Sequence, residues 1–387
     1  MPEALARAVR EVEPAEVRAV HGEPLTLPPV APDRWIAGVA PHGIRTGFRG
    51  QDRIPAPGAL DAGSLVVRCG TRVLRRGADY LVDPVWGTIG TTAADAEQVT
   101  VDYRYSLRRL DAIMRREDGR VVPLRGRSHL TGPRPPVPAS GELLGTVLVP
   151  YFGGAGSGEA FPYVEPPRRV SPPQGGRLPE TTRRLREHAG LRVVCWGDSV
   201  TCGGDASAEA TAYPALVERG LRDAGADARV TVVAVDGSNS AQWLSGEGVA
   251  CDWRRVEAAR PHLVTLEFVN DAELDPAVWP SLYGEILARV RRMGAELLVT
   301  TPHFTMPAWM GSDRPADPDG RAYTAFLRAF CRSGSVALAD VSLRWEHLAL
   351  EALPYVTLLH NGVNHPDDRG HALAADEILA ALGATAA

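Results

Sequence analysis

The sequence predicts an α/β fold for its second half, a five-stranded parallel sheet flanked by helices, preceded by a smaller β-rich, sandwich-like domain. Three observations support this prediction. Up to about residue 151 the chain holds short runs of β-branched and aromatic residues between Gly and Asp turns. After about residue 181 apolar runs alternate with segments of helical period, which is the pattern of βα units. Between the two patterns lie proline-rich segments, which behave as extended spacers.

These patterns divide the 387 residues into four parts. Residues 1–30 are predicted as an N-terminal extension with an amphipathic helix over residues 3–20, and residues 31–165 as the β-rich accessory domain. Residues 166–182 are predicted as a Pro-rich linker, and residues 183–387 as the catalytic domain. Within the accessory domain, Val99, Val101, Tyr103 and Tyr105 alternate with polar neighbours, as a half-buried strand requires. A sugar-binding face, an oligomer contact and a lid all remain open as its role.

In the second half, five apolar runs predict strands and four segments predict helices. The strand runs are 193–196, 230–235, 263–268, 296–300 and 337–341, and the helical segments are 212–224, 277–293, 323–331 and 371–382. Glycines at 225, 294 and 383 follow three of these helices, where a C-terminal stop is expected.

Polar residues follow several of these strands in an order that suits serine catalysis. Ser199 comes after the first strand in Gly197-Asp198-Ser199, and His365 precedes the last helix. A serine hydroxyl is a weak nucleophile and needs a neighbouring base to take its proton. The N–H groups of Ser199 and Gly237 and the side chain of Asn270 are candidates for an oxyanion hole. Each motif alone is equally typical of a turn, a helix cap or a loop, so the prediction rests on their joint order.

At these residues the chain resembles the SGNH hydrolases, also called GDSL esterases or lipases, over roughly residues 183–381. The matching blocks are Gly197-Asp198-Ser199, Gly237, Asn270-Asp271 and His365-Pro366. The resemblance implies a flavodoxin-like sheet and ester hydrolysis through an acyl-enzyme without a cofactor. It implies that Ser199 is the nucleophile, that His365 is the general base, and that Ser199, Gly237 and Asn270 form the oxyanion hole.

The sequence departs from the family pattern at two places. Phe268 replaces a usual glycine, which predicts a narrower floor beside the site and a contact with substrate. The family also has an Asp three or four residues before the His, and here those positions hold Gly362 and Asn361. We expect Asn361 or a backbone carbonyl to orient His365, while Asp340 and Asp367 remain less favoured acids.

Other histidines have separate predicted roles. His303 follows the fourth predicted strand of the second half and is a candidate for contact with substrate, whereas His360 and His371 are expected to be local structural residues. No His or Cys residues stand at the spacing of a metal site, so we expect no zinc or other metal; the absence of a cofactor is what the resemblance implies.

The totals restrict the classes of partner. A net charge of −5 is not typical of a nucleic-acid-binding protein, and no apolar stretch is long enough for a membrane helix. We therefore expect neither a nucleic acid nor a membrane as a partner. The sequence shows no secretory signal, and its five scattered cysteines fit a reducing compartment, which predicts a cytoplasmic protein. A homo-oligomer stays open.

The predicted function is removal of a short, acetyl-like group from a sugar or small metabolite. Two alternatives remain: an acyltransferase that uses the same acyl-enzyme, and a glycan-binding protein with a weakened hydrolase domain.

Overall fold

The computed structural model describes residues 3–32, 48, 57–246, 250–311 and 317–384, and it divides into two compact units. The first comprises Met1–Pro166 and Ala349–Asn364, and the second comprises Pro167–Leu348 and His365–Ala387. The candidate catalytic residues Ser199 and His365 both belong to the second unit.

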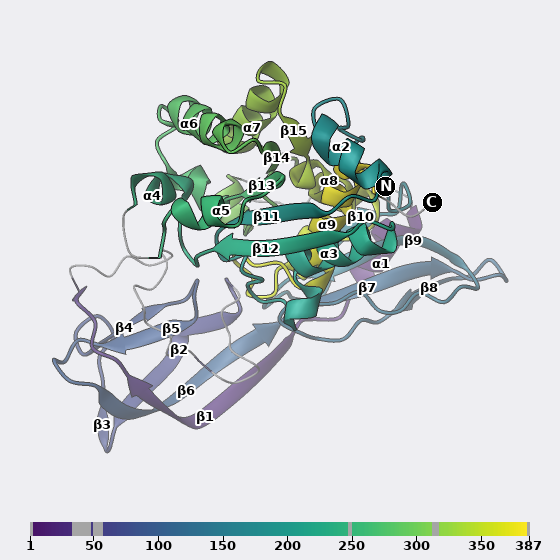
Figure 1. Cartoon of the computed structure of the whole chain (residues 1–387). Helices are drawn as coiled ribbons and strands as arrows, with labels where there is room; N and C mark the ends of the chain where they lie inside the picture. The colour runs from purple at the N-terminus through teal and green to yellow at the C-terminus, as the bar shows by residue number, and fades with distance from the viewer. Residues whose placement is uncertain (1–2, 33–47, 49–56, 247–249, 312–316, 385–387) are drawn as a thin grey trace. The chain divides into compact units, whose positions relative to one another are not determined.

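The second unit is built on a five-stranded parallel sheet, as predicted (Figure 1). Its strands, listed in spatial order, are β12 (Ala228–Ala234), β11 (Leu191–Gly197), β13 (Leu263–Glu267), β14 (Glu296–Thr300) and β15 (Ala337–Ala339). The first strand along the chain, β11, therefore lies between the second and the third. Such a reversal of strand order leaves a crevice at the carboxyl ends of the strands, where α/β folds bind their ligands.

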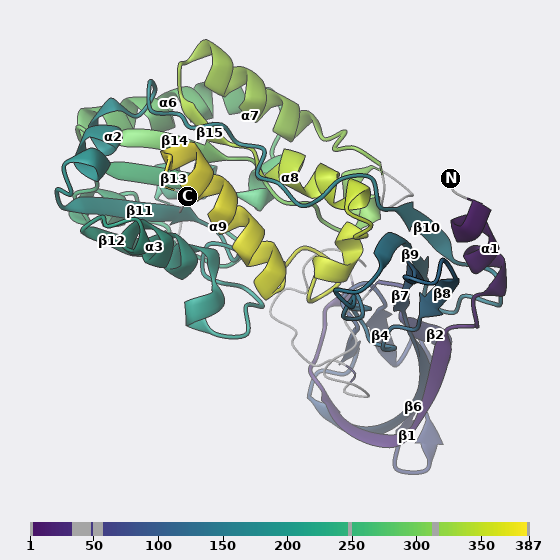
Figure 2. The same cartoon turned by 90° about the vertical axis from the view of Figure 1, so that its right-hand side faces the viewer.

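Eight α-helices described in this unit surround the sheet. They are α2 (Pro179–Arg186), α3 (Tyr213–Asp223), α4 (Ser240–Ser245), α5 (Arg254–Ala258), α6 (Trp279–Arg292), α7 (Ala322–Ser333), α8 (Val341–His347) and α9 (Asp368–Leu382). Helices α3 and α9 lie on one side of the sheet, and α6 and α7 lie on the other (Figure 1 and Figure 2). The predicted helices and strands all occur, with ends shifted by a few residues.

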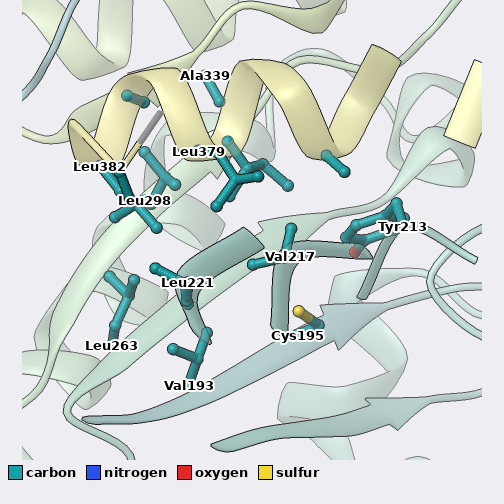
Figure 3. Close-up of a cluster of buried hydrophobic side chains, with 14 of the residues drawn as sticks. Val193, Cys195, Tyr213, Val217, Leu221, Leu263, Leu298, Ala339, Leu379 and Leu382 are labelled. Carbon is teal, nitrogen blue, oxygen red and sulfur yellow. The ribbon is translucent and has the colours of Figure 1, made fainter. Parts of the chain in front are cut away.

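Strand β11 contributes to both cores because its side chains alternate between the two faces of the sheet. Val193 and Cys195 pack with residues of α3 and α9, as Figure 3 shows. Val194 and Trp196 pack in the opposite cluster with residues of α6 and α7. A strand buried on both faces gives a fixed starting point for the loop that follows it.

The first unit is β-rich, as predicted, and the strand pairs that the structure describes in it are antiparallel. It contains α1 (Glu3–Glu11), a sheet ordered β1 (Glu16–Leu27), β6 (Glu97–Leu107), β2 (Leu60–Cys69) and β3 (Arg72–Val73), and the hairpin β4 (Tyr80–Asp83) with β5 (Thr88–Thr91). Its other sheet is ordered β10 (Glu159–Pro162), β9 (Glu142–Val149), β7 (Arg109–Arg115) and β8 (Val121–Leu124).

The predicted helix over residues 3–20 is wrong beyond Glu11. Helix α1 ends there, and β1 begins at Glu16 and pairs with β6. Pro14 explains the break, since proline lacks an N–H and disfavours the α conformation of the residue before it. Residues 1–30 are therefore not an extension, because they contribute α1 and β1 to the first unit.

Residues 349–364 belong to the first unit, so the part predicted as one domain from residue 183 onward is interrupted. Val164 donates its N–H to Leu350 O at 2.7 Å, and Thr146 Oγ1 donates to Ala352 O at 2.9 Å. The predicted linker is also partly fixed, since Ser171 donates its N–H to Glu377 Oε2 at 2.7 Å and α2 begins at Pro179.

Candidate functional site

The loop that carries Ser199 turns sharply at the end of β11. A Cβ at Gly197 would lie 2.0 Å from Thr201 Oγ1 and 2.2 Å from Glu267 O, so only glycine fits there. Asp198 holds the turn, because its Oδ1 accepts the N–H of Val200 at 3.1 Å. The turn leaves the Ser199 side chain at the strand end, in a residue that is 6% exposed.

Ser199 and His365 are hydrogen-bonded although they lie far apart in the sequence. The Ser199 hydroxyl is 2.9 Å from His365 Nε2, and His365 Nδ1 is 3.0 Å from Asp205 Oδ2. A carboxylate can only accept, so Nδ1 carries the proton and Nε2 presents its lone pair to the hydroxyl. The three side chains have the arrangement of nucleophile, base and acid.

Asp205 reaches the imidazole from the same loop as Ser199. Its backbone is in the left-handed region with φ +60, where Asp is tolerated better than most residues. A Cβ at the preceding Gly204 would lie 2.8 Å from Ser199 O and 2.9 Å from His365 Cε1. Glycine at this position therefore lets the loop pass beside the imidazole.

The prediction that Asn361 orients His365 differs from the structure, which places Asp205 at Nδ1. Asn361 instead serves its own turn: its Oδ1 accepts the N–H groups of Val363 and Asn364, both at 2.9 Å. Its Nδ2 donates to Asn364 Oδ1 at 3.1 Å. An imidazole N–H has one proton to donate, and the carboxylate of Asp205 accepts it.

The two other acids considered from the sequence have structural roles. Asp340 caps the N-terminus of α8 and pairs with Arg328 at 2.8 Å. Asp367 caps the N-terminus of α9 and pairs with Arg369 at 2.7 Å. Sequence reasoning missed Asp205 because the family spacing directs attention to residues before the His. Its only local signal is a Gly203-Gly204-Asp205 turn after the nucleophile.

The loops after β12 and β13 lie beside the loop that carries Ser199, residues 198–205, which we call the nucleophile loop. Gly197 pairs in register with Ala234 and Glu267, so the three strands end level with one another. Asn270 donates its N–H to Asp198 Oδ2 at 3.2 Å and its Nδ2 to Ser238 O at 3.0 Å. The carboxamide of Asn270 has a second N–H, and Gly237 adopts φ +70 in the turn before Ser238. The candidate oxyanion donors therefore come from adjoining loops.

Asp271 fixes the loop after β12 through hydrogen bonds to Ser240. It is fully buried, and its Oδ1 and Oδ2 accept the N–H and the hydroxyl of Ser240 at 2.8 and 2.6 Å. Burial raises the pKa of Asp271 to about 6. The two neighbouring residues thus bind different loops. The N–H of Asn270 binds Asp198 of the nucleophile loop, and the carboxylate of Asp271 binds Ser240, the first residue of α4.

Two further buried carboxyl groups support the nucleophile loop. Burial raises the pKa of Asp198 to about 7. Glu267 is 4% exposed and accepts a hydrogen bond from Thr201 Oγ1 at 3.0 Å. Burial, together with the nearby Asp198, raises the pKa of Glu267 well above its ordinary value.

Phe268 and His303, both predicted to contact substrate, are buried. Phe268 is 1% exposed, and its ring centroid lies 5.0 Å from that of Trp196 in an edge-on contact, so it is a core residue. His303 is 4% exposed and lines a small internal cavity together with Glu267 and Thr300. Phe268 therefore fills the core.

In the part of the chain that the structure describes, no three His, Cys, Asp or Glu side chains are grouped so that they could hold a metal ion. Within those same residues, none of the helices has both the length and the hydropathy needed to span a membrane.

Residues 195–373 match the GDSL-like Lipase/Acylhydrolase family. A two-domain esterase active on acetylated mannans is 17% identical with a TM-score of 0.43, and the likeness covers 54% of this chain and 52% of that one. This chain thus spans about half the length of that esterase. An acetylxylan esterase from Geobacillus stearothermophilus is 18% identical with a TM-score of 0.40, covering 51% and 97% of the two chains. No curated protein matches this chain in sequence.

Proposed function

We propose that this chain is a carboxylic ester hydrolase that works through an acyl-enzyme on Ser199, since its residues 195–373 match the GDSL-like Lipase/Acylhydrolase family. In this proposal His365 is the general base and Asp205 is the acid of the triad. The observation that carries the proposal is the pair of hydrogen bonds that joins Ser199, His365 and Asp205, at 2.9 and 3.0 Å.

In the first half-reaction Ser199 Oγ attacks the ester carbonyl carbon while His365 Nε2 takes the hydroxyl proton. The imidazolium that forms is stabilised by the negative charge of Asp205, which also fixes the ring orientation through Nδ1–H. The carbonyl oxygen becomes an oxyanion, which accepts hydrogen bonds from the N–H groups of Ser199 and Gly237 and from the Asn270 carboxamide. His365 then gives its Nε2 proton to the leaving alcohol as the C–O bond breaks.

In the second half-reaction a water molecule attacks the acyl-enzyme, and His365 Nε2 takes one of its protons. Collapse of the second tetrahedral intermediate releases the carboxylic acid, and the same proton returns to Ser199 Oγ. Every proton in the cycle passes through Nε2, so the chemistry uses this chain's own side chains and needs no cofactor.

We further propose that the acyl group is short and that it is carried by a sugar or another hydroxylated small molecule. The loops that adjoin at the strand ends support this proposal because they carry glycines and hydrogen-bonding residues, namely Gly203, Gly204, Gly237, Ser238 and Asn270. Such a surface suits a polar leaving group better than a long alkyl chain.

A fluorophosphonate probe and a series of p-nitrophenyl esters test the proposal. We expect the wild-type protein to be labelled at Ser199, to release p-nitrophenol in a burst, and to prefer acetate over octanoate. Ser199→Ala should lose labelling and about 10⁶-fold in kcat, whereas Ser281→Ala, an exposed serine on α6, should behave as wild type. Full activity of Ser199→Ala would refute the assignment, and preference for octanoate would refute the short acyl group.

We also propose that the protein works in a reducing compartment such as the cytoplasm. All five cysteines are free thiols, at positions 69, 195, 202, 251 and 331. Thiols of this kind are stable where glutathione keeps them reduced. Ester hydrolysis should therefore be unchanged by added dithiothreitol, and a mass measurement on freshly isolated protein should find five thiols.

A further inference from the structure

The segment from Gly204 to Tyr213, which carries Asp205, is attached at both ends to His371 of α9. Gly204 O lies 3.2 Å from His371 Nε2, and the N–H of Tyr213 lies 3.3 Å from His371 Nδ1. A backbone carbonyl only accepts and a backbone N–H only donates, so His371 is fixed as the neutral tautomer with its proton on Nε2. His371 is fully buried, and its ring stacks on Tyr213 with centroids 6.3 Å apart.

The middle of the same segment is attached to Asp368, the first residue of α9. The carboxylate of Asp368 accepts three hydrogen bonds, from Ser207 N at 2.7 Å, Ser207 Oγ at 2.5 Å and Thr211 Oγ1 at 2.8 Å. Hydrogen bonds to an ionised carboxylate are short and about twice as strong as neutral ones. Asp368 therefore holds the segment two residues beyond Asp205.

The segment needs this support because its own conformation is unfavourable. Asp205 lies in the left-handed region with φ +60. A non-glycine residue in this region is strained and persists only where its surroundings enforce it. Helix α9 also follows His365 directly, so one rigid element carries both attachments and begins three residues after the base.

We propose that Asp368 and His371 are positioning residues, which hold the carboxylate of Asp205 against His365 Nδ1. Neither contacts the reacting atoms, and both act through the segment that carries the acid. This inference rests on the proposed function, in which Asp205 stabilises the imidazolium of His365.

A double-mutant cycle with Asp205 tests the inference. In the full chain, Asp368→Asn and His371→Leu should each lower kcat for p-nitrophenyl acetate about tenfold or more, with KM changed less than about twofold. In an Asp205→Ala background the same substitutions should lower kcat by less than about twofold, because no carboxylate remains to be positioned. His371→Gln, which can still donate to Gly204 O, should recover part of the loss.

The matched control is Asp376→Asn, the same chemical change on an exposed, ion-paired residue of α9, which should leave kcat unchanged. Equal losses of kcat with and without Asp205 would overturn the inference, and so would wild-type kcat in Asp368→Asn. If His371→Leu does not fold, Asp368→Asn alone decides between these results. Should Ser199→Ala be inactive and Asp205→Ala fully active, the hydrolase would stand and the positioning role would fall. Activity of Ser199→Ala would refute the proposed function itself.

Discussion

Two segments near His365 in the sequence or the structure carry similar polar side chains that bind different partners. They are residues 198–205, the loop that carries Ser199, and residues 361–364, which precede His365. The first supplies both the proposed nucleophile and the carboxylate that faces His365 Nδ1. The second holds Asn361 where the family usually has its acid, and Asn361 closes a local turn instead. The acid of the proposed triad is therefore the carboxylate that lies against the imidazole in space, whatever its distance from the His along the chain.

The substitution that tests this comparison most strongly is Asp205→Asn. The amide keeps the size of the side chain but carries no charge to stabilise the imidazolium. We therefore expect kcat for p-nitrophenyl acetate to fall about 10⁴-fold while KM stays similar. Asp223→Asn, an exposed change at the end of α3, is the matched control and should be silent. A loss smaller than about tenfold would mean that another group orients His365.

The strand ends were predictable from sequence, and the acid was not. Apolar runs and glycine stops identify β11 and β13, so the positions of Ser199 and Asn270 at their carboxyl ends follow from pattern alone. The position of Asp205 beside His365 depends on the left-handed backbone of Asp205 itself and on the contacts of its segment with α9. It also depends on Gly204, which leaves room for the imidazole. These are tertiary effects that no local pattern encodes.

The same limit explains the other differences. Phe268 lies at the end of an apolar run, and only the tertiary packing against Trp196 decides that its ring enters the core. Residues 349–364 carry no compositional sign that they join the first unit, because they contribute backbone carbonyl groups to these bonds, which accept from Thr146 Oγ1 in β9 and from the N–H of Val164.

The second prediction concerns Gly204→Ala, because a glycine at this position leaves room for the imidazole of His365. The added methyl group would lie 2.9 Å from His365 Cε1 and 2.8 Å from Ser199 O, so either the ring or the loop must shift. Displacement of a catalytic group by 1 Å can lower turnover about 10²-fold. We expect kcat to fall by about ten- to a hundredfold with a small change in melting temperature.

The control for this substitution is Gly284→Ala in α6, where an added Cβ meets nothing within 4 Å. It should keep wild-type kcat and stabilise the helix slightly. Wild-type kcat in Gly204→Ala would show that the acid-bearing loop can move away from His365 without loss, which would weaken the contrast between the two segments.

The third prediction concerns pH. The loop that carries Ser199 is hydrogen-bonded to the titratable side chain of Glu267, whereas the turn of Asn361 is held by amide groups, which do not titrate. The pKa of Glu267 is raised in the folded state by burial, so the folded protein holds this proton more tightly than the unfolded chain does. The resulting stability is complete below the ordinary pKa of 4.5 and is lost as the pH rises through the raised value. Glu267→Gln, which is neutral at every pH, should therefore show a melting temperature that falls less with rising pH.

The measurement is a set of thermal unfolding curves from pH 5 to pH 9, with the gap between wild type and Glu267→Gln expected to widen by about 3 °C or more. Glu209→Gln, an exposed change, should follow the wild-type curve. Parallel curves for wild type and Glu267→Gln would mean that Glu267 is ionised in the folded protein.

The smallest effect is expected for Asn361→Asp, which restores the family's usual residue type in the segment before the His. The introduced carboxylate could still accept the two N–H groups, but the bond from Nδ2 to Asn364 Oδ1 would be lost. We expect kcat to change by less than about twofold and stability to fall by about 1 kcal/mol. The decisive background is Asp205→Asn. If Asn361→Asp restores activity there, a carboxylate at position 361 can serve His365, and the two segments are interchangeable. If it does not, the acid belongs to the nucleophile loop alone, because the carboxylate at position 361 stays bound to the turn that it closes.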